Sequence, residues 1–414
     1  MIENRSGSTQ HQALSTKLGG SSRPFLSADC LVLIAYCLVL SACGCSTVTR
    51  LSPLQLPAPG LQSSSDAPVL DDGYADYAGV VHIHTTFSHD AHGRFEDVVR
   101  VANAQHLDYV IVTEHNNLQP LRAGLQGWHG ATLVLIGMEI STRGGHYLAF
   151  NVTEEIDRTK FTTQQVIDEV NRQGGLGFIA HPYFKNGRWK DWSVHGFLGV
   201  EAYNVAHDTL DENKLRLALW TLSAPAEPLY LSLLDRPYDP LAKWDELIRQ
   251  HGRVVGIGSA DAHEFHLLGV KFAPYDDIFQ LARTHVLIAS SPLTPEAIYD
   301  ALRRGHAYFS IALIGEAKGF TFMADDGQRV AGVMGDVVAL APKLALTAVL
   351  PAPANLTLFK DGRAIDAFTG ARWRIPVTAP GVYRLEAMRR GKPWIFSNPI
   401  YVRPSPTVVD SPPS

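Results

Sequence analysis

Short apolar runs, each followed by polar residues, recur along the first three quarters of the chain. Runs rich in Val, Ile and Leu and bounded by turn residues predict buried strands, and apolar residues at helical spacing predict helices between them. The predicted strands are one that begins near Ala78 and those at 108–113, 131–139, 145–150, 176–181, 199–204 and 253–259. The predicted helices lie at 94–106, 162–173, 209–222, 240–251 and 295–304. This alternation predicts a parallel sheet covered by helices.

Histidines and carboxylates follow most of the predicted strands. His82 and His84 are two residues apart at the end of the first strand, so both side chains should face the same side. Such a pair is either half of a metal site or a core histidine beside a surface one. Residues of the same chemistry follow, Asp90 in the loop after the first strand and the others near later strands: His115, Glu139, His146, His181, Glu201, Asp261 and His263. A closed β/α barrel would bring them to one mouth, whereas an open sheet would spread them along an edge, so we expect a barrel.

The pattern changes near Gly319. Short alternating runs at 343–350, 355–359, 381–387 and 394–402 predict a small β-sandwich. We therefore expect a barrel over residues 76–312, a β-sandwich over 313–403 and a disordered tail over 404–414.

The N-terminal part has the order of a secretory signal: a polar segment with basic residues, the apolar run Cys30–Leu40, and then small residues. The run is shorter than the roughly 20 residues that a membrane-spanning helix needs. Leu40-Ser-Ala-Cys43 resembles a bacterial lipoprotein box, in which Cys43 would carry the lipid. We expect a signal segment over 1–43, a flexible tether over 44–75 and a location in the bacterial cell envelope, on the periplasmic or extracellular face. An uncleaved anchor, ordinary secretion and lipidation of Cys45 are the alternatives.

Composition narrows the chemistry. The net charge of -5 argues against a nucleic-acid partner. All four cysteines lie between Cys30 and Cys45, so a metal in the folded body would be held by His, Asp and Glu, which suits Zn, Mn or Fe. The body contains neither the Gly-x-Ser-x-Gly motif of serine hydrolases nor the Gly-rich lysine motif of P-loop enzymes.

The candidate ligands outnumber what one metal ion can use, so two or three divalent ions could share them. Two ions roughly 4 Å apart could hold a hydroxide between them and clamp a phosphoryl or carbonyl oxygen. The expected reaction is metal-assisted hydrolysis, and ligand number alone does not tell which bond is cleaved.

Five motifs in order resemble those of the polymerase and histidinol phosphatase (PHP) family over about residues 78–310. They are His82-x-His84-Thr-x-x-Ser-x-Asp90, Thr113-Glu-His115-Asn, Gly137-x-Glu139, Ala180-His181-Pro182 and Gly258-Ser-x-Asp261-x-His263. The resemblance implies a distorted seven-stranded β/α barrel with a di- or trinuclear metal site, usually one that hydrolyses phosphate esters. Two departures are Glu114, where the family usually has Asp, and one extra residue in the last motif.

When the metal-binding positions of the family are transferred to this sequence, the resemblance implies ligands for three ions. His82, His84, Glu139 and Asp261 would hold the first, and Glu139 would bridge to a second that is completed by His181, with His146 as a further candidate. Asp90, His115 and His263 would hold the third.

The expected function is that of an exported metal-dependent hydrolase, foremost a phosphoesterase, that uses a metal-bound hydroxide on a small-molecule ester. Glu139, His181 and Asp261 are the expected catalytic residues, and Asp261 or a metal-site histidine would handle the proton. The C-terminal region is similar to a branch that includes carbaryl hydrolases, so carboxyl or carbamate ester cleavage is an alternative. A non-catalytic metal-binding envelope protein is another.

Three basic residues lie just past ligand motifs and could bind an anionic group of the substrate, or be ordinary surface residues. They are Arg143, Lys185 and Arg188.

Overall fold

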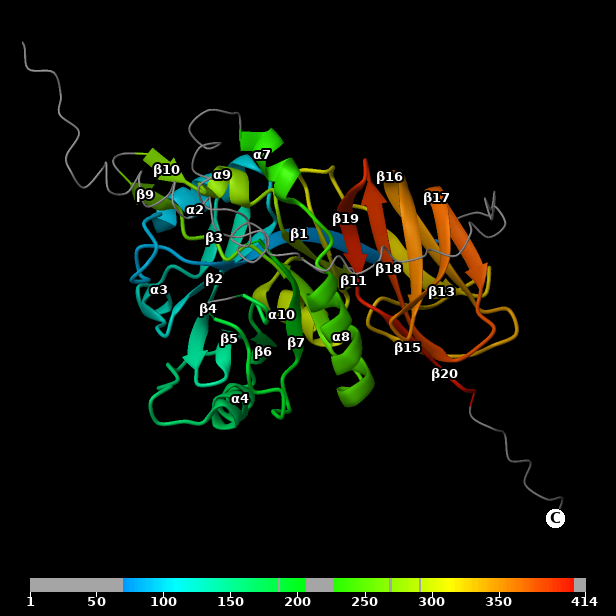
Figure 1. The fold of residues 1–414 in the computed structure, drawn as a ribbon, viewed down its shortest axis with the longest axis horizontal. Helices are drawn as coiled ribbons and strands as arrows, with labels where there is room; N and C mark the ends of the chain where they lie inside the picture. Colours follow the sequence, from blue (N-terminus) through cyan, green and yellow to red (C-terminus); the bar gives the residue numbers. More distant parts are fainter. Residues whose placement is uncertain (1–69, 185–186, 206–225, 268–269, 290–291, 406–414) are drawn as a thin grey trace, which may run out of the picture. The chain divides into compact units, whose positions relative to one another are not determined.

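The computed structural model describes residues 70–184, 187–205, 226–267, 270–289 and 292–405 (Figure 1). The predicted signal with Cys43, almost all of the tether, the predicted helix at 209–222, Lys185 and most of the predicted tail lie outside the described residues. No helix in the described part of the chain is long and apolar enough to cross a membrane.

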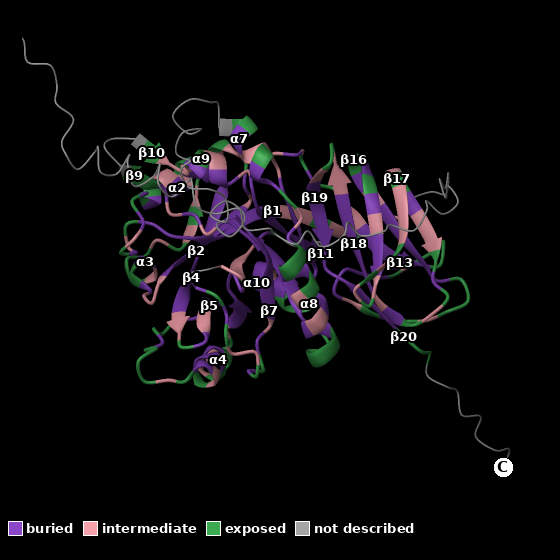
Figure 2. Cartoon of the chain, viewed as in Figure 1, coloured by how far each residue is buried: buried purple, intermediate pink, exposed green. Residues whose placement is uncertain are grey.

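A mixed sheet carries the predicted ligands. β1 (Tyr74–Ile83), β2 (Tyr109–His115) and β4 (Thr132–Thr142) are parallel neighbours. β6 (Leu176–Ile179), β7 (Gly199–Asn204) and β8 (Val255–Ser259) form a second parallel set. The strands of both sets are buried over most of their length, as their apolar sequences predict (Figure 2).

The prediction of a parallel sheet is wrong for the strand between these two sets. β5 (Gly145–Phe150) is antiparallel to both β4 and β6. Only Arg143 and Gly144 separate β4 from β5, and a parallel connection needs a crossover of a dozen or more residues. β3 (Gly127–His129) also pairs with β4 in antiparallel fashion.

Two strands that we did not predict extend the sheet beyond β1. β11 (Arg283–Ala289) is antiparallel to β1, and β12 (Ala307–Ser310) is antiparallel to β11. β1 and the segment after β8 share three backbone hydrogen bonds: Ala260 N to Val81 O, Ala262 N to His82 O and His84 N to Ala262 O, at 3.0, 3.2 and 2.9 Å. Within the described ranges the strand ladders do not close into a ring, so the fold is a mixed α/β arrangement and a closed barrel stays a prediction.

Four helices match predicted ones to within about two residues at each end. They are α2 (Phe95–Ala104), α4 (Thr163–Arg172), α8 (Tyr238–His251) and α10 (Pro295–Arg304), and each buries an apolar face. Three shorter helices were not predicted: α3 (Gln119–Arg122), α7 (Ala226–Leu233) and α9 (Tyr275–Ile278). The small hairpin of β9 (Phe265–Leu267) and β10 (Val270–Phe272) was not predicted either.

The C-terminal region is made of strands, mostly antiparallel. They are β13 (Thr321–Asp325), β14 (Val330–Val333), β15 (Val337–Ala339), β16 (Ala345–Lys360), β17 (Arg363–Pro376), β18 (Gly381–Arg389), β19 (Lys392–Ser397) and β20 (Ile400–Arg403). The two runs predicted at 343–350 and 355–359 belong to the single strand β16, whose pairing with β17 shifts between Val349 and Ala354. β19 also pairs with β12, so hydrogen bonds cross the boundary predicted between 312 and 313.

Candidate metal centre

Three of the predicted ligands have unusual backbone geometry. His82, His181 and Asp261 have positive φ angles of 64°, 22° and 48°. This region is unfavourable for residues with a Cβ, and such strain gathers at functional sites. At His82 it interrupts the pairing of β1 with β2 between Val81 and Ile83. Simple strand alternation therefore does not hold there, although the rings of His82 and His84 still lie only 5.0 Å apart.

Glu139 lies at the middle of the cluster. It is fully buried at the end of the apolar strand β4. Five histidines from three other chain segments and from β5 place a ring nitrogen 2.7–3.3 Å from its carboxylate: His82, His84, His115, His146 and His181. His82, His84 and His115 approach Oε2, whereas His146 and His181 approach Oε1. A carboxylate contacted on both oxygens can bridge two metal ions.

Asp261 and Asp90 complete the donor set on the side of His263. Asp261 Oδ1 lies 3.4 Å from His82 Nε2 and 3.6 Å from both His84 Nε2 and His263 Nδ1. Asp90 Oδ2 lies 3.2 Å from His115 Nε2 and 3.7 Å from His263 Nε2. The structure thus brings together all nine residues predicted to bind metal.

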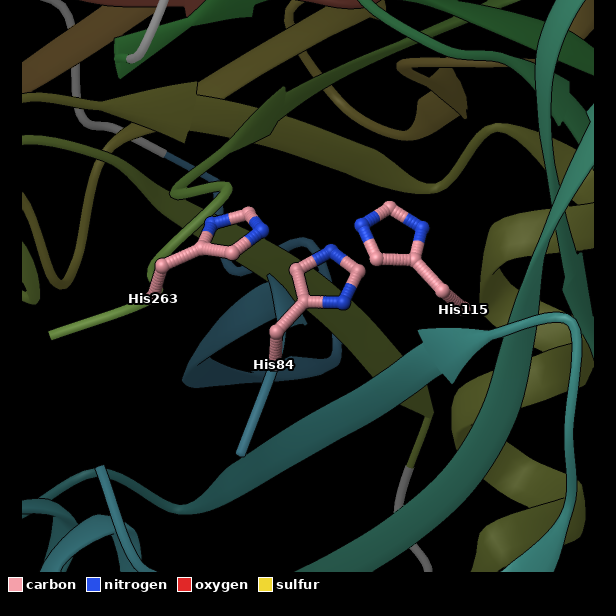
Figure 3. Close-up of side chains that lie close together, drawn as sticks. All are labelled: His84, His115 and His263. Atoms are coloured by element: carbon pink, nitrogen blue, oxygen red, sulfur yellow. The ribbon is translucent and has the colours of Figure 1, made fainter. Parts of the chain in front are cut away.

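Three of the histidine rings are stacked. The ring of His84 lies 4.2 Å from that of His115 and 4.2 Å from that of His263. Figure 3 shows these rings converging, with one nitrogen of each directed toward the space between them, within 4.8 Å of one another. Three further triads meet the same spacing: His82 with Glu139 and His181, His82 with His84 and Asp261, and His115 with Glu139 and His146.

Several nitrogen and oxygen atoms of this cluster that could bind a metal are buried and have no hydrogen-bond partner. They are His82 Nε2, His84 Nε2, Asp90 Oδ1, His115 Nδ1, Glu139 Oε2 and His181 Nδ1. Buried polar atoms are rarely left unpaired, and each unpaired one is destabilising by roughly 1–3 kcal/mol. Nitrogen and carboxylate oxygen are ligands for Zn, Mn or Fe, so the residues present fit a group of divalent cations. The cluster does not choose among these metals.

The electrostatics of the cluster hold Glu139 and His84 in the forms that bind metals. Burial alone would raise the pKa of Glu139, but the charge of His82, the close approach of His115 and hydrogen bonds with His146 and His181 hold it well below its ordinary range. Burial and the neighbouring His263 lower the pKa of His84 to about 3. At neutral pH Glu139 is therefore ionised and His84 is neutral, the forms in which both bind metals.

His115 differs from His84. Burial opposes its protonation, but the carboxylates of Asp90 and Glu139, 3.2 and 2.9 Å from its ring nitrogens, raise its pKa to about 10. A divalent cation that binds this ring would therefore displace a proton, and the two carboxylates would then neutralise the cation instead.

Two buried carboxylates, Glu201 and Glu114, form hydrogen bonds with the residues around the histidine cluster. His82 Nδ1 donates to Glu201 Oε1 at 2.7 Å, and the backbone N–H of His181 donates to Glu201 Oε2 at 2.5 Å. Glu201, which sequence analysis placed among the strand-end candidates, thus leaves His82 Nε2 free to face Glu139. Glu114 instead accepts from Ser88 Oγ and Thr85 Oγ1, both at 2.5 Å. Ser88 Oγ lies 3.2 Å from His84 Nδ1, and no sequence signal assigned this role to Ser88 or Thr85.

Arg143 and Arg188, two of the three basic residues predicted to bind the substrate, are not paired with the carboxylates of the cluster. Arg143 is exposed, and the guanidinium of the exposed Arg188 lies 5.7 Å from the ring centre of Tyr183. Across the part of the chain that is described, no ion pair joins either arginine to Glu139, Asp261 or Asp90.

Comparison with known families agrees with the geometry of this centre. The family model described as PHP domain matches residues 81–320, which is more than half of the 414-residue chain. The chain belongs to the PHP family. The match spans every residue of the candidate metal centre of this PHP protein.

Individual relatives are remote. The uncharacterized protein MJ1587 of Methanocaldococcus jannaschii is 28% identical over 149 residues, which cover 31% of this chain and 81% of that protein. A two-domain protein of Bacteroides vulgatus, described as containing a predicted PHP-like metal-dependent phosphoesterase, is 17% identical with a TM-score of 0.41, covering 82% of this chain and all of that one. PsfC of Pseudomonas syringae is 15% identical with a TM-score of 0.37, covering 57% of this chain and 91% of that one. Nothing about the activity of this PHP protein follows from these two structures.

Proposed function

We propose that this PHP protein is a metal-dependent hydrolase that cleaves phosphate esters of small molecules. The observation that carries the proposal is the convergence of buried, unpaired donor atoms from separate strand ends around Glu139. Bound cations would stabilise such a cluster, because several of its buried nitrogen and oxygen atoms have no hydrogen-bond partner. The family match supports hydrolysis as the class of reaction.

The ligand set divides among the proposed cations as follows. His82, His84, Glu139 and Asp261 would hold one, Glu139 with His146 and His181 a second, and Asp90, His115 and His263 a third. Bound divalent cations would make water a stronger nucleophile at neutral pH and stabilise negative charge on the reacting oxygens.

The protein's own groups have complementary roles in this proposal. Glu139 and His181 are buried, so their proposed role is to hold the cations in place. The Asp90 side chain is 40% exposed and lies at the solvent-facing edge of the cluster. Asp261, whose side chain is 7% exposed beside His263, is the proposed acceptor of the proton released from the attacking water.

We also propose export and attachment to the membrane through a lipid on Cys43. The order of charged, apolar and small residues in the N-terminal sequence, followed by the lipoprotein-like box, supports it. Metabolic labelling with a fatty acid, compared between the parent and Cys43→Ala, tests it. Label that persists in Cys43→Ala would contradict lipidation at this position.

The first prediction concerns Glu139. The full chain should contain at least two metal ions by elemental analysis and hydrolyse p-nitrophenyl phosphate or bis-p-nitrophenyl phosphate. Glu139→Ala should lose at least half of the metal and more than about 100-fold in kcat, because it removes the shared ligand. Glu96→Gln, at an exposed carboxylate of α2, is the matched control.

The outcomes separate the alternatives. Turnover of p-nitrophenyl acetate alone would favour a carboxyl or carbamate ester hydrolase. Metal binding without turnover of any of the three substrates would favour a non-catalytic metal-binding protein. Less than one metal ion per chain, not restored by Zn, Mn or Fe, would contradict the metal centre itself.

A further inference from the structure

An exposed phenylalanine lies beside the candidate metal centre. Phe265 begins β9, two residues after His263, and is 44% exposed. Its ring is parallel to that of His263, with 5.6 Å between ring centres and 5° between planes. His263 in turn stacks on the fully buried ring of His84. The three rings form a continuous series from the surface to the centre.

The backbone around Phe265 is firmly held. The preceding residue, Glu264, is fully buried and accepts hydrogen bonds from Lys271 Nζ at 2.6 Å and from the backbone N–H of Tyr275 at 3.4 Å. Tyr275 Oη donates to the backbone oxygen of His84 at 2.6 Å, which ties the same segment to the centre. An exposed ring on a fixed backbone loses little conformational entropy when a ligand covers it.

A second aromatic ring lies at another edge of the centre. The half-buried Phe184 contacts the ring of His181 edge to face, with 5.6 Å between ring centres. By contrast, among the described residues no lysine or arginine forms an ion pair with Asp90, Asp261 or Glu139. Phe184 and Phe265 therefore provide aromatic surface at two edges of the centre.

Single exposed apolar residues are common and need no explanation by themselves. Phe265 differs because its ring is stacked on a predicted metal ligand and its backbone is fixed. We propose that Phe265 contacts the substrate and selects esters whose leaving group carries a planar aromatic ring. The inference rests on the proposed phosphoesterase function and names its substrate class. A flat ring of the leaving group would lie against the exposed part of Phe265 while the ester oxygens face the centre.

The test compares substrates in the metal-loaded full chain. Phe265→Ala should lower kcat/KM for p-nitrophenyl phosphate about 3- to 10-fold more than for glycerol 2-phosphate. The ratio between the two substrates removes any general effect on the centre. Phe265→Tyr should retain the parent ratio because it keeps the ring. Trp128→Ala, at a 56% exposed aromatic residue on β3, is the matched control and should leave the ratio unchanged.

A binding measurement separates this inference from the proposed function. The metal-loaded parent should bind phenylphosphonate more tightly than methylphosphonate by calorimetry, and Phe265→Ala should lose about 3- to 10-fold of that preference. If neither phosphate is hydrolysed, the proposed function fails, and the phosphonate preference still decides the role of Phe265. Equal binding of the two phosphonates to the parent, or a preference that survives in Phe265→Ala, overturns the inference. An unchanged substrate ratio with both phosphates hydrolysed overturns it and leaves the phosphoesterase standing.

Discussion

Glu201 forms hydrogen bonds with two histidines of the candidate metal centre, one through each carboxylate oxygen. Oε1 accepts from His82 Nδ1, and Oε2 accepts from the backbone N–H of His181 and from Asn204 Nδ2, the last at 2.9 Å. The first bond fixes the tautomer of His82, and the second holds His181 at its strained φ angle. One carboxylate thus orients ligands from two different strand ends.

Glu201→Gln should weaken metal binding about 10- to 100-fold while leaving the fold intact. An amide has one acceptor oxygen, so its NH₂ group would face either the His82 Nδ1–H or the two donors at Oε2. Competition with a chelator measures the affinity, circular dichroism checks the fold, and Glu96→Gln is the control. Metal affinity equal to that of the parent would show that Glu201 does not orient the ligands.

The residue types of the centre could be predicted, whereas their geometry could not. His82 and His84 attract attention because paired histidines end an apolar strand. Their common orientation does not come from strand alternation, however, because His82 has a φ angle of 64°. Arg143 and Arg188 are exposed, and their proposed contact with an anionic group of the substrate stays a prediction.

Strand direction is where the prediction of elements failed. Buried apolar runs read alike in parallel and antiparallel sheets, so β5 could be distinguished only by the two residues that separate it from β4. β11 and β12 were missed although both are buried over most or all of their length. Helices were predicted better, because their periodicity and caps are local.

α4 provides a test of such a local signal. Thr162 Oγ1 accepts from Gln165 N at 3.3 Å, and Gln165 Oε1 accepts from Thr162 N at 2.9 Å, which together form a capping box. Thr162→Ala should lower the free energy of unfolding by about 1 kcal/mol, measured by urea denaturation, without changing metal content. Thr153→Ala, at an exposed threonine outside the helices, should have no comparable effect. Equal stabilities of these two variants would contradict the capping role.

Across the whole molecule, buried polar contacts join the region matched by the PHP family to the C-terminal strands. Arg384 on β18 donates two hydrogen bonds to Asp245 on α8, at 2.8 and 2.6 Å, and one to Glu386 at 2.6 Å. Arg236 donates two more to Glu386, at 2.6 and 2.7 Å. The guanidinium of Arg384 also lies 4.3 Å from the ring centre of Phe359.

A second buried polar contact joins the C-terminal strands to β8. Asn398, between β19 and β20, accepts from Gly256 N at 2.8 Å and donates to Gly256 O and Ala307 O, both at 2.9 Å. Its side chain thereby pairs with the backbone of the strand that leads to Asp261 and His263. Through these hydrogen bonds the C-terminal strands help to hold β8, and with it the segment of Asp261 and His263, in place.

Glu386→Gln should lower the free energy of unfolding by about 3 kcal/mol at neutral pH, because it leaves the half-buried Arg236 and the buried Arg384 without a full counter-charge. Burial raises the pKa of Glu386, but the charges of Arg384 and Arg236 bring it below the ordinary 4.5. A lowered pKa in the folded state means that the ionised carboxylate stabilises the protein above about pH 4.5 and that this contribution is lost as the pH falls through the folded-state pKa. The difference between parent and Glu386→Gln should therefore be largest near pH 7 and shrink toward about pH 3. Urea denaturation of both proteins across this range measures it, with Glu96→Gln as the exposed control. A difference that stays constant as the pH falls would contradict a stabilising charge on Glu386.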